Sequence, residues 1–186
     1  MPGEEGCRAL WDRFAMPQHI REHSLQVALI ATFVAECAEA AGLAVSVPAV
    51  RASALLHDIA KDYTIRHGGN HSQLGGAWTV ELTDNPAIAQ GVMHHVFWPW
   101  DILDVEDHFL PLAIIYADKR VKHGQIVSLE ERHEDLITRY GTSDYIRQRI
   151  EISRQQVDEI ETTFSQALNV ELHACTFDSR GLVQRA

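Results

Sequence analysis

The sequence predicts an all-α protein, a compact bundle of about seven or eight helices. Apolar residues recur at spacings of three and four along most of the chain, as in helices that bury one face. No stretch alternates between apolar and polar residues over the length of a strand, and neither Asn-Gly nor Asp-Gly occurs to mark a tight hairpin. Glycines such as Gly42 and Gly141 follow periodic segments, where they favour the end of a helix.

Local signals divide this pattern into successive elements. Pro17 and Pro48 suit the first turn of a helix, Ser46 suits an N-cap, and Ser128 with Glu131 forms a capping box. We therefore expect helices over residues 7–15, 17–41, 48–60, 71–82, 86–95, 108–123, 128–140 and 143–168. The glycine-rich segment 66–70, the aromatic segment 97–100 and the tail from residue 169 show no regular pattern.

The length and composition of the chain limit the number of domains and the classes of ligand that it can bind. A chain of 186 residues with 46% hydrophobic and 23% charged residues is typical of one globular domain, here residues 1–186 with a helical core over about 17–168. A formal net charge of −10 opposes unspecific binding to nucleic acid. A small phosphorylated ligand remains compatible with this charge, because a metal ion can reverse the local field.

The cysteines and the apolar segments predict a cytoplasmic protein. Cys7, Cys37 and Cys175 are odd in number and far apart, which argues against a disulfide framework and against a cysteine zinc site. The first six residues lack the apolar run of a secretory signal. The most apolar segment, residues 27–35, is too short to span a membrane.

The most informative motif is the dipeptide His57-Asp58, which directly follows the apolar run Ala54-Leu55-Leu56. Burying two such groups without partners is costly. Adjacent residues of a helix diverge by about 100°, yet near a helix end they can converge on one centre. Taken alone, the dipeptide fits a capped helix end with a solvent-facing histidine better than it fits a metal site.

The dipeptide is one member of an ordered set, which runs His23, His57-Asp58, His71, His94-His95, Asp118. The segments REHSLQVA, ALLHDIAK, HSQLGGA and YADKR carry these residues. The set resembles the HD superfamily of metal-dependent phosphohydrolases over about residues 17–140, and most of all its HDIG-type members and the family that hydrolyses diadenosine tetraphosphate. His57-Asp58 is followed here by Ile59-Ala60 instead of Ile-Gly, which leaves the subfamily open.

The resemblance implies a two-metal site. His23, His57, Asp58 and Asp118 would bind the first ion, and Asp58 would bridge to the second. His71 would complete the second ion's ligands together with His95 or His94. Because one helix face does not easily present both adjacent histidines to the same side, His95 is favoured over His94, although both serve as ligands in some members.

The chemistry of these side chains agrees with that implication. Imidazoles combined with carboxylates suit iron, manganese, zinc, cobalt or nickel, and we favour iron or manganese. Two such ions, roughly 3.5–4 Å apart, lower the pKa of a bridging water from roughly 16 toward 7, so that hydroxide attacks phosphorus. Lys61 follows Asp58 by three residues, and it either contacts the substrate phosphate or is an ordinary solvated lysine. The expected reaction is hydrolysis of a phosphate ester or anhydride, and the resemblance favours nucleotides, including dinucleoside polyphosphates.

Three alternatives remain. His19-Ile20-Arg21-Glu22-His23 matches the HxxEH signature of inverzincin peptidases, but that site would not explain the other ligands. A diiron oxygenase of the HD fold would use the same ligands, and a non-catalytic module could bind a nucleotide or a protein.

Trp98 and Trp100 could stack on a nucleobase, although core packing is the commoner role. The last expected helix could support a homodimer through its apolar stripe.

Overall fold

The computed structural model describes residues 1–102, 105–177 and 183–184, and these residues confirm an all-α architecture. The helices are α1 (Glu4–Arg13), α2 (Gln18–Ala40), α3 (Val47–Leu56), α4 (Lys61–His67), α5 (His71–Thr83), α6 (Pro86–His94), α7 (Val105–Lys119), α8 (Leu129–Tyr140) and α9 (Asp144–Leu168). Two small antiparallel hairpins pair β1 (Val121–Lys122) with β2 (Gln125–Ile126) and β3 (Thr176–Phe177) with β4 (Val183–Gln184), and a 3₁₀ turn covers Leu172–Ala174.

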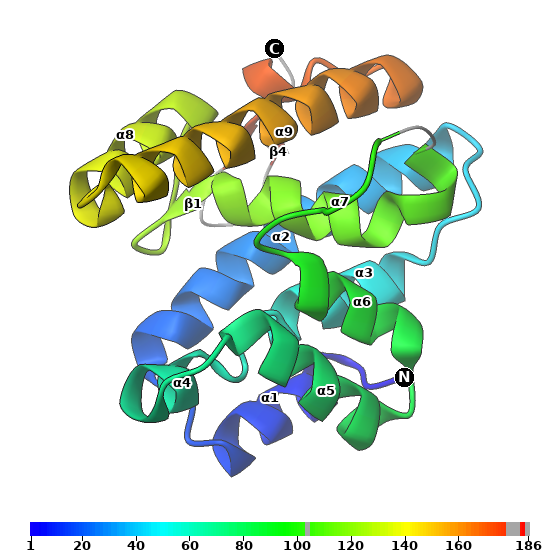
Figure 1. The fold of residues 1–186 in the computed structure, drawn as a ribbon. Coiled ribbons are helices and arrows are strands. Elements are labelled where there is room, and N and C mark those ends of the chain that lie inside the picture. Colours follow the sequence, from blue (N-terminus) through cyan, green and yellow to red (C-terminus); the bar gives the residue numbers. More distant parts are fainter. Residues whose placement is uncertain (103–104, 178–182, 185–186) are drawn as a thin grey trace.

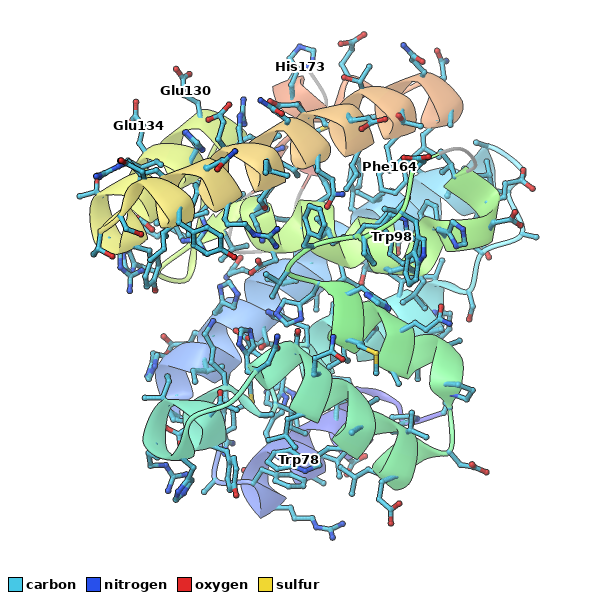
Figure 2. The ribbon with its side chains drawn as sticks, viewed as in Figure 1. Trp78, Trp98, Glu130, Glu134, Phe164 and His173 are labelled. Carbon is cyan, nitrogen blue, oxygen red and sulfur yellow. The ribbon has the colours of Figure 1, made fainter. Side chains whose placement is uncertain are left out.

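The helices stack in layers (Figure 1). Helices α8 and α9 lie side by side at one end of the molecule, and α1, α4 and α5 lie at the other. Between them, α2 packs along α3 and α7, while α6 bridges α5 and α7. Phe164 points from α9 toward α7, where its ring centroid lies 5.1 Å from that of Phe109 (Figure 2).

Buried apolar side chains form a cluster that runs from Cys7 to Cys175. The indole nitrogen of Trp11 in α1 donates a hydrogen bond to the Leu55 carbonyl oxygen of α3 at 2.8 Å, which links the two helices. Within the described residues, no helix is both apolar enough and long enough to cross a membrane.

Side-chain caps fix the beginnings of the helices that later matter for the site. The Asn70 side-chain oxygen accepts hydrogen bonds from the backbone nitrogens of Ser72 and Gln73, so α5 begins at His71 as predicted. Asn85 caps α6 in the same manner ahead of Pro86. Each of these caps sets where a helix starts, and therefore which face the following histidines occupy.

Three expectations about the elements were wrong. The helix predicted over residues 48–60 covers Val47–Leu56 and is followed by a turn. The predicted helix over residues 108–123 instead covers Val105–Lys119 and is followed by the β1–β2 hairpin. The two central turn residues, His123 and Gly124, both have positive φ angles, so a histidine occupies a turn position that usually favours asparagine or aspartate. Helix α4 was not predicted, because its seven residues are too few to show a clear apolar period.

The segment that ends in His94 and His95 is held tightly. Gly91 of α6 lies where an added methyl group would overlap Ser53 of α3 and Leu110 of α7. The Ser53 hydroxyl also donates a buried hydrogen bond to the Ile88 carbonyl oxygen at 2.9 Å. Close packing of three helices therefore restricts the position at which His95 leaves α6.

Candidate metal centre

The structure brings six of the predicted site residues together at the ends and faces of separate elements. They are His23 from α2, His57 and Asp58 from the turn between α3 and α4, His71 at the start of α5, His95 directly after α6, and Asp118 near the end of α7. The turn after Leu56 explains how His57 and Asp58 converge, since the regular helix has already ended there. Both side chains are almost fully buried.

Asp58 lies at the centre of this cluster. Its Oδ2 atom is 3.5 Å from His57 Nε2 and 3.8 Å from His23 Nε2. Its Oδ1 atom is 3.4 Å from His71 Nε2 and 3.6 Å from His95 Nε2. The two carboxylate oxygens thus face two different pairs of imidazoles, which is the arrangement that a bridging carboxylate requires.

The pairs define two half-sites that share Asp58. In the first half-site, Asp118 Oδ1 is 3.0 Å from His23 Nε2 and 3.9 Å from His57 Nε2. In the second half-site, the Nε2 atoms of His71 and His95 are 3.2 Å apart. Without a cation, two imidazole nitrogens at this distance need a shared proton, whereas a bound cation would accept both lone pairs.

Backbone carbonyls orient two of the imidazoles. The Nδ1 atom of His57 lies 2.7 Å from the Ala54 carbonyl oxygen, and the Nδ1 atom of His95 lies 2.7 Å from the Val92 carbonyl oxygen. Each carbonyl belongs to the last turn of a helix, where it lacks an intrahelical partner. Donation from Nδ1–H leaves Nε2 as a lone pair that faces the cluster, as in metal-ligating histidines.

Two buried polar atoms of this centre lack hydrogen-bond partners, as expected where a metal ion binds. His57 Nε2 and Asp58 Oδ1 are buried and have no hydrogen-bond partner among the described residues. Leaving such atoms unsatisfied costs about 1–3 kcal/mol each, and more for a charged group. A divalent cation in each half-site would satisfy both atoms.

Electrostatics also prepare the side chains as ligands. Burial lowers the pKa of His95 to about 3 and lowers the pKa values of His23 and His71, so these imidazoles stay neutral. Burial raises the pKa of Asp58, but attraction to His57 and to Lys61 outweighs it and holds that pKa well below its usual value. Neutral imidazoles beside an ionised carboxylate are the protonation states that bind metal. His57 differs, because burial lowers its pKa but attraction to Asp58 outweighs burial and raises it, so a metal ion bound by His57 would displace a proton.

Comparison with known proteins agrees with this geometry. The model of the HD domain family matches residues 20–136, a range that contains all six clustered residues. The chain belongs to the HD domain family. Members of this family are generally metal-dependent hydrolases, which confirms the superfamily predicted from the sequence. No curated protein and no solved structure matches the chain.

Two histidines that were considered as ligands from the sequence, His94 and His19, lie outside the six-residue cluster. The His94 ring packs edge-on against Trp98 and Trp100, with centroids 5.2 Å from each, instead of joining His95. Trp98 itself is buried, whereas Trp100 is largely exposed. His19, which the peptidase alternative requires, belongs to neither group of potential ligands in the described part of the chain.

A cavity of about 310 Å³ opens beside the first half-site of the HD domain. On the metal side it is lined by His23, Asp58 and Lys61, whose Nζ atom is 2.7 Å from Asp58 Oδ2. The opposite side is formed by residues that the sequence did not single out, including His123, Arg132, Arg139 and Tyr140. The spacing of seven between Arg132 and Arg139, which places both on one helix face, was the available signal.

Proposed function

We propose that this HD domain is a phosphohydrolase with a dinuclear metal centre. The observation that carries the proposal is the position of Asp58, whose two oxygens face separate pairs of imidazoles 3.4–3.8 Å away. A structural site would need only one closed ligand set, whereas a shared carboxylate between two incomplete sets leaves room for substrate. Membership of the HD domain family supports the same reaction class.

In this proposal each half-site holds one ion. His23, His57 and Asp118 bind the first, His71 and His95 bind the second, and Asp58 binds both. His94 has no place in the set, because its ring lies against the two tryptophans. A set dominated by imidazole favours transition metals over magnesium or calcium, and iron or manganese remain our first candidates.

When bound, the two ions would activate water and neutralise charge on the phosphoryl oxygens. The side chains of this chain position the remaining partners. The Lys119 ammonium donates to Asp118 Oδ2 at 2.8 Å and holds that carboxylate in place. The water oxygen loses a proton to solvent and forms a new bond to phosphorus as the bond to the leaving oxygen breaks, and the electron pair of the broken bond stays on that oxygen. The Lys61 ammonium, at the edge of the cavity, can stabilise the resulting negative charge.

A nucleotide, including a dinucleoside polyphosphate, is our proposed substrate. A cavity of about 310 Å³ suits a small molecule better than a polymer. Tyr140 and Ile65 line it, and both side chains are exposed enough to contact an apolar surface such as a nucleobase. Trp98 and Trp100 do not line this cavity, which favours Tyr140 as the aromatic contact.

The deciding experiment combines elemental analysis with a phosphate-release screen of nucleoside phosphates and dinucleoside polyphosphates. We expect about two equivalents of transition metal per chain and release of phosphate or of a nucleotide. Full metal loading with no turnover of any compound would instead indicate a binding module. Oxygen consumption with a polyol would indicate the diiron oxygenase, and a single zinc lost in His19→Ala would indicate the peptidase.

Lys61→Met tests the proposed role of the lysine. Its ammonium contacts Asp58 but is not itself a ligand, so we expect kcat/KM to fall by about 10²-fold while both metal ions remain. Lys61→Arg should recover part of the loss because it keeps the charge. Loss of metal in Lys61→Met would show that the lysine only orders Asp58, and unchanged kinetics would show that it is an ordinary solvated residue.

A further inference from the structure

Helix α8 has two chemically different faces. Glu130 and Glu134 point outward, away from the rest of the molecule (Figure 2). Arg132 and Arg139 lie on the cavity side, and both line the same space as Asp58 and Lys61. In a chain with a net charge of −10, this local concentration of arginine is directed toward the candidate metal centre.

A single carboxylate organises this basic face. Asp135, whose side chain is 7% exposed, accepts a hydrogen bond from Arg132 Nη1 at 2.9 Å. Its oxygens also lie 3.7 Å from Arg139 Nη1 and 3.5 Å from His123 Nε2 at the tip of the β1–β2 hairpin. The single negative charge of Asp135 therefore lies among two guanidinium groups and an imidazole. This face of α8 keeps more positive charge and more hydrogen-bond donors than Asp135 can neutralise or accept.

The donors on this face are only partly used. The Nε–H group of Arg132 is buried and has no hydrogen-bond partner among the described residues. The guanidinium of Arg139 also lies 5.0 Å from the centre of the Tyr140 ring, which restricts its orientation at the cavity wall. A guanidinium fork held in place at a cavity wall is suited to an anion with several oxygens, such as a phosphate group.

The basic face lies close enough to the metal centre to act on the same molecule. Both border one cavity of about 310 Å³. A ligand whose reacting phosphate lies beside Asp58 can therefore extend toward α8.

We propose that Arg132, Arg139 and His123, held together by Asp135, form a binding subsite for a second phosphate group of the substrate. This inference rests on the proposed function and narrows its substrate class. The preferred substrate carries two or more linked phosphates, one beside the metal half-sites and the next against α8. A nucleoside diphosphate or a longer polyphosphate fits this description, whereas a nucleoside monophosphate leaves the subsite empty.

The test compares Arg139→Gln with Arg13→Gln, an identical change at an exposed arginine of α1. The measured quantity is the ratio of kcat/KM for a nucleoside diphosphate to kcat/KM for the corresponding monophosphate, in metal-loaded protein. We expect Arg139→Gln to lower this ratio about tenfold, the effect of losing one charge-assisted hydrogen bond. Arg13→Gln should leave the ratio unchanged. Adding His123→Gln to Arg139→Gln should lower the ratio further.

Direct binding separates this inference from the proposed function. Calorimetric titration with inorganic pyrophosphate and with inorganic phosphate needs no turnover. Weaker pyrophosphate binding in Arg139→Gln, with no hydrolysis by the wild type, would support the subsite and reject the phosphohydrolase. Hydrolysis by the wild type with an unchanged ratio in both Arg139 variants would reject the subsite and keep the phosphohydrolase. Equal losses for both substrates would also reject the subsite, because they would indicate a general effect of charge.

Discussion

Replacing Asp58 by asparagine is expected to remove both metal ions and to lower phosphohydrolase kcat by at least ~10²–10³-fold. The side chain keeps its shape, but the amide offers one oxygen where the carboxylate offers two. Since Asp58 Oδ1 and Oδ2 face different half-sites, neither would retain a complete ligand set. Metal content by elemental analysis and phosphate release should therefore fall together.

Asp62→Asn is the matched control. Asp62 lies four residues further along, where it forms an ion pair with Arg66 at 2.6 Å on the surface of α4. Its substitution removes the same charge without touching the half-sites, so metal content and kcat should stay near wild type. Wild-type turnover in Asp58→Asn, or loss of only one ion, would contradict the bridging role of Asp58.

The sequence predicted which residues come together better than it predicted their surroundings. His23, His57, His71 and Asp118 were singled out by their order along the chain, which resembles the HD superfamily, and the structure brings them to one place. Helical geometry predicted that His94 and His95 face different directions and slightly favoured His95, but it did not show what fixes the direction of each ring. Packing of Gly91 against α3 and α7 sets that direction.

The second wall of the cavity was missed for a different reason. The spacing of Arg132 and Arg139 places them on one helix face, but a charged helix face is usually solvated, and the sequence does not show what this face meets. Their placement depends on the β1–β2 hairpin, which the sequence did not predict, and on how α8 folds back toward α2. Long-range contacts of this kind leave no periodic pattern.

Removing the metal ions with a chelator is expected to destabilise the protein by about 2–3 kcal/mol for each ion, at a free metal concentration near 100 times Kd. The proposed ligands come from α2, α5, α7 and the segments after α3 and α6, so only the folded chain assembles both half-sites. For a domain of this size, the corresponding decrease in Tm is roughly 5–10 °C for each ion. Differential scanning calorimetry with and without chelator measures it, and equal Tm values would contradict an integral metal site.

The chelated protein should also become unstable in mild acid. Burial lowers the native pKa of His95 to about 3, whereas the unfolded chain titrates near 6.5, so protons bind preferentially to the unfolded state as pH falls below about 6.5. His23 and His71 act in the same direction. The raised pKa of His57, where attraction to Asp58 outweighs the opposing effect of burial, changes stability mainly above about pH 6.5.

Between about pH 6.5 and pH 5, one such buried histidine lowers the free energy of unfolding by about 2 kcal/mol. The carboxylates do not contribute to this loss, because their unfolded pKa values lie near 4. His95→Gln keeps a polar side chain that cannot be protonated, so the chelated variant should lose less stability over this range than the chelated parent. Urea unfolding at pH 7 and pH 5 measures the difference. Identical pH dependence in both proteins would show that His95 is not a buried neutral imidazole, and would remove it from the second half-site.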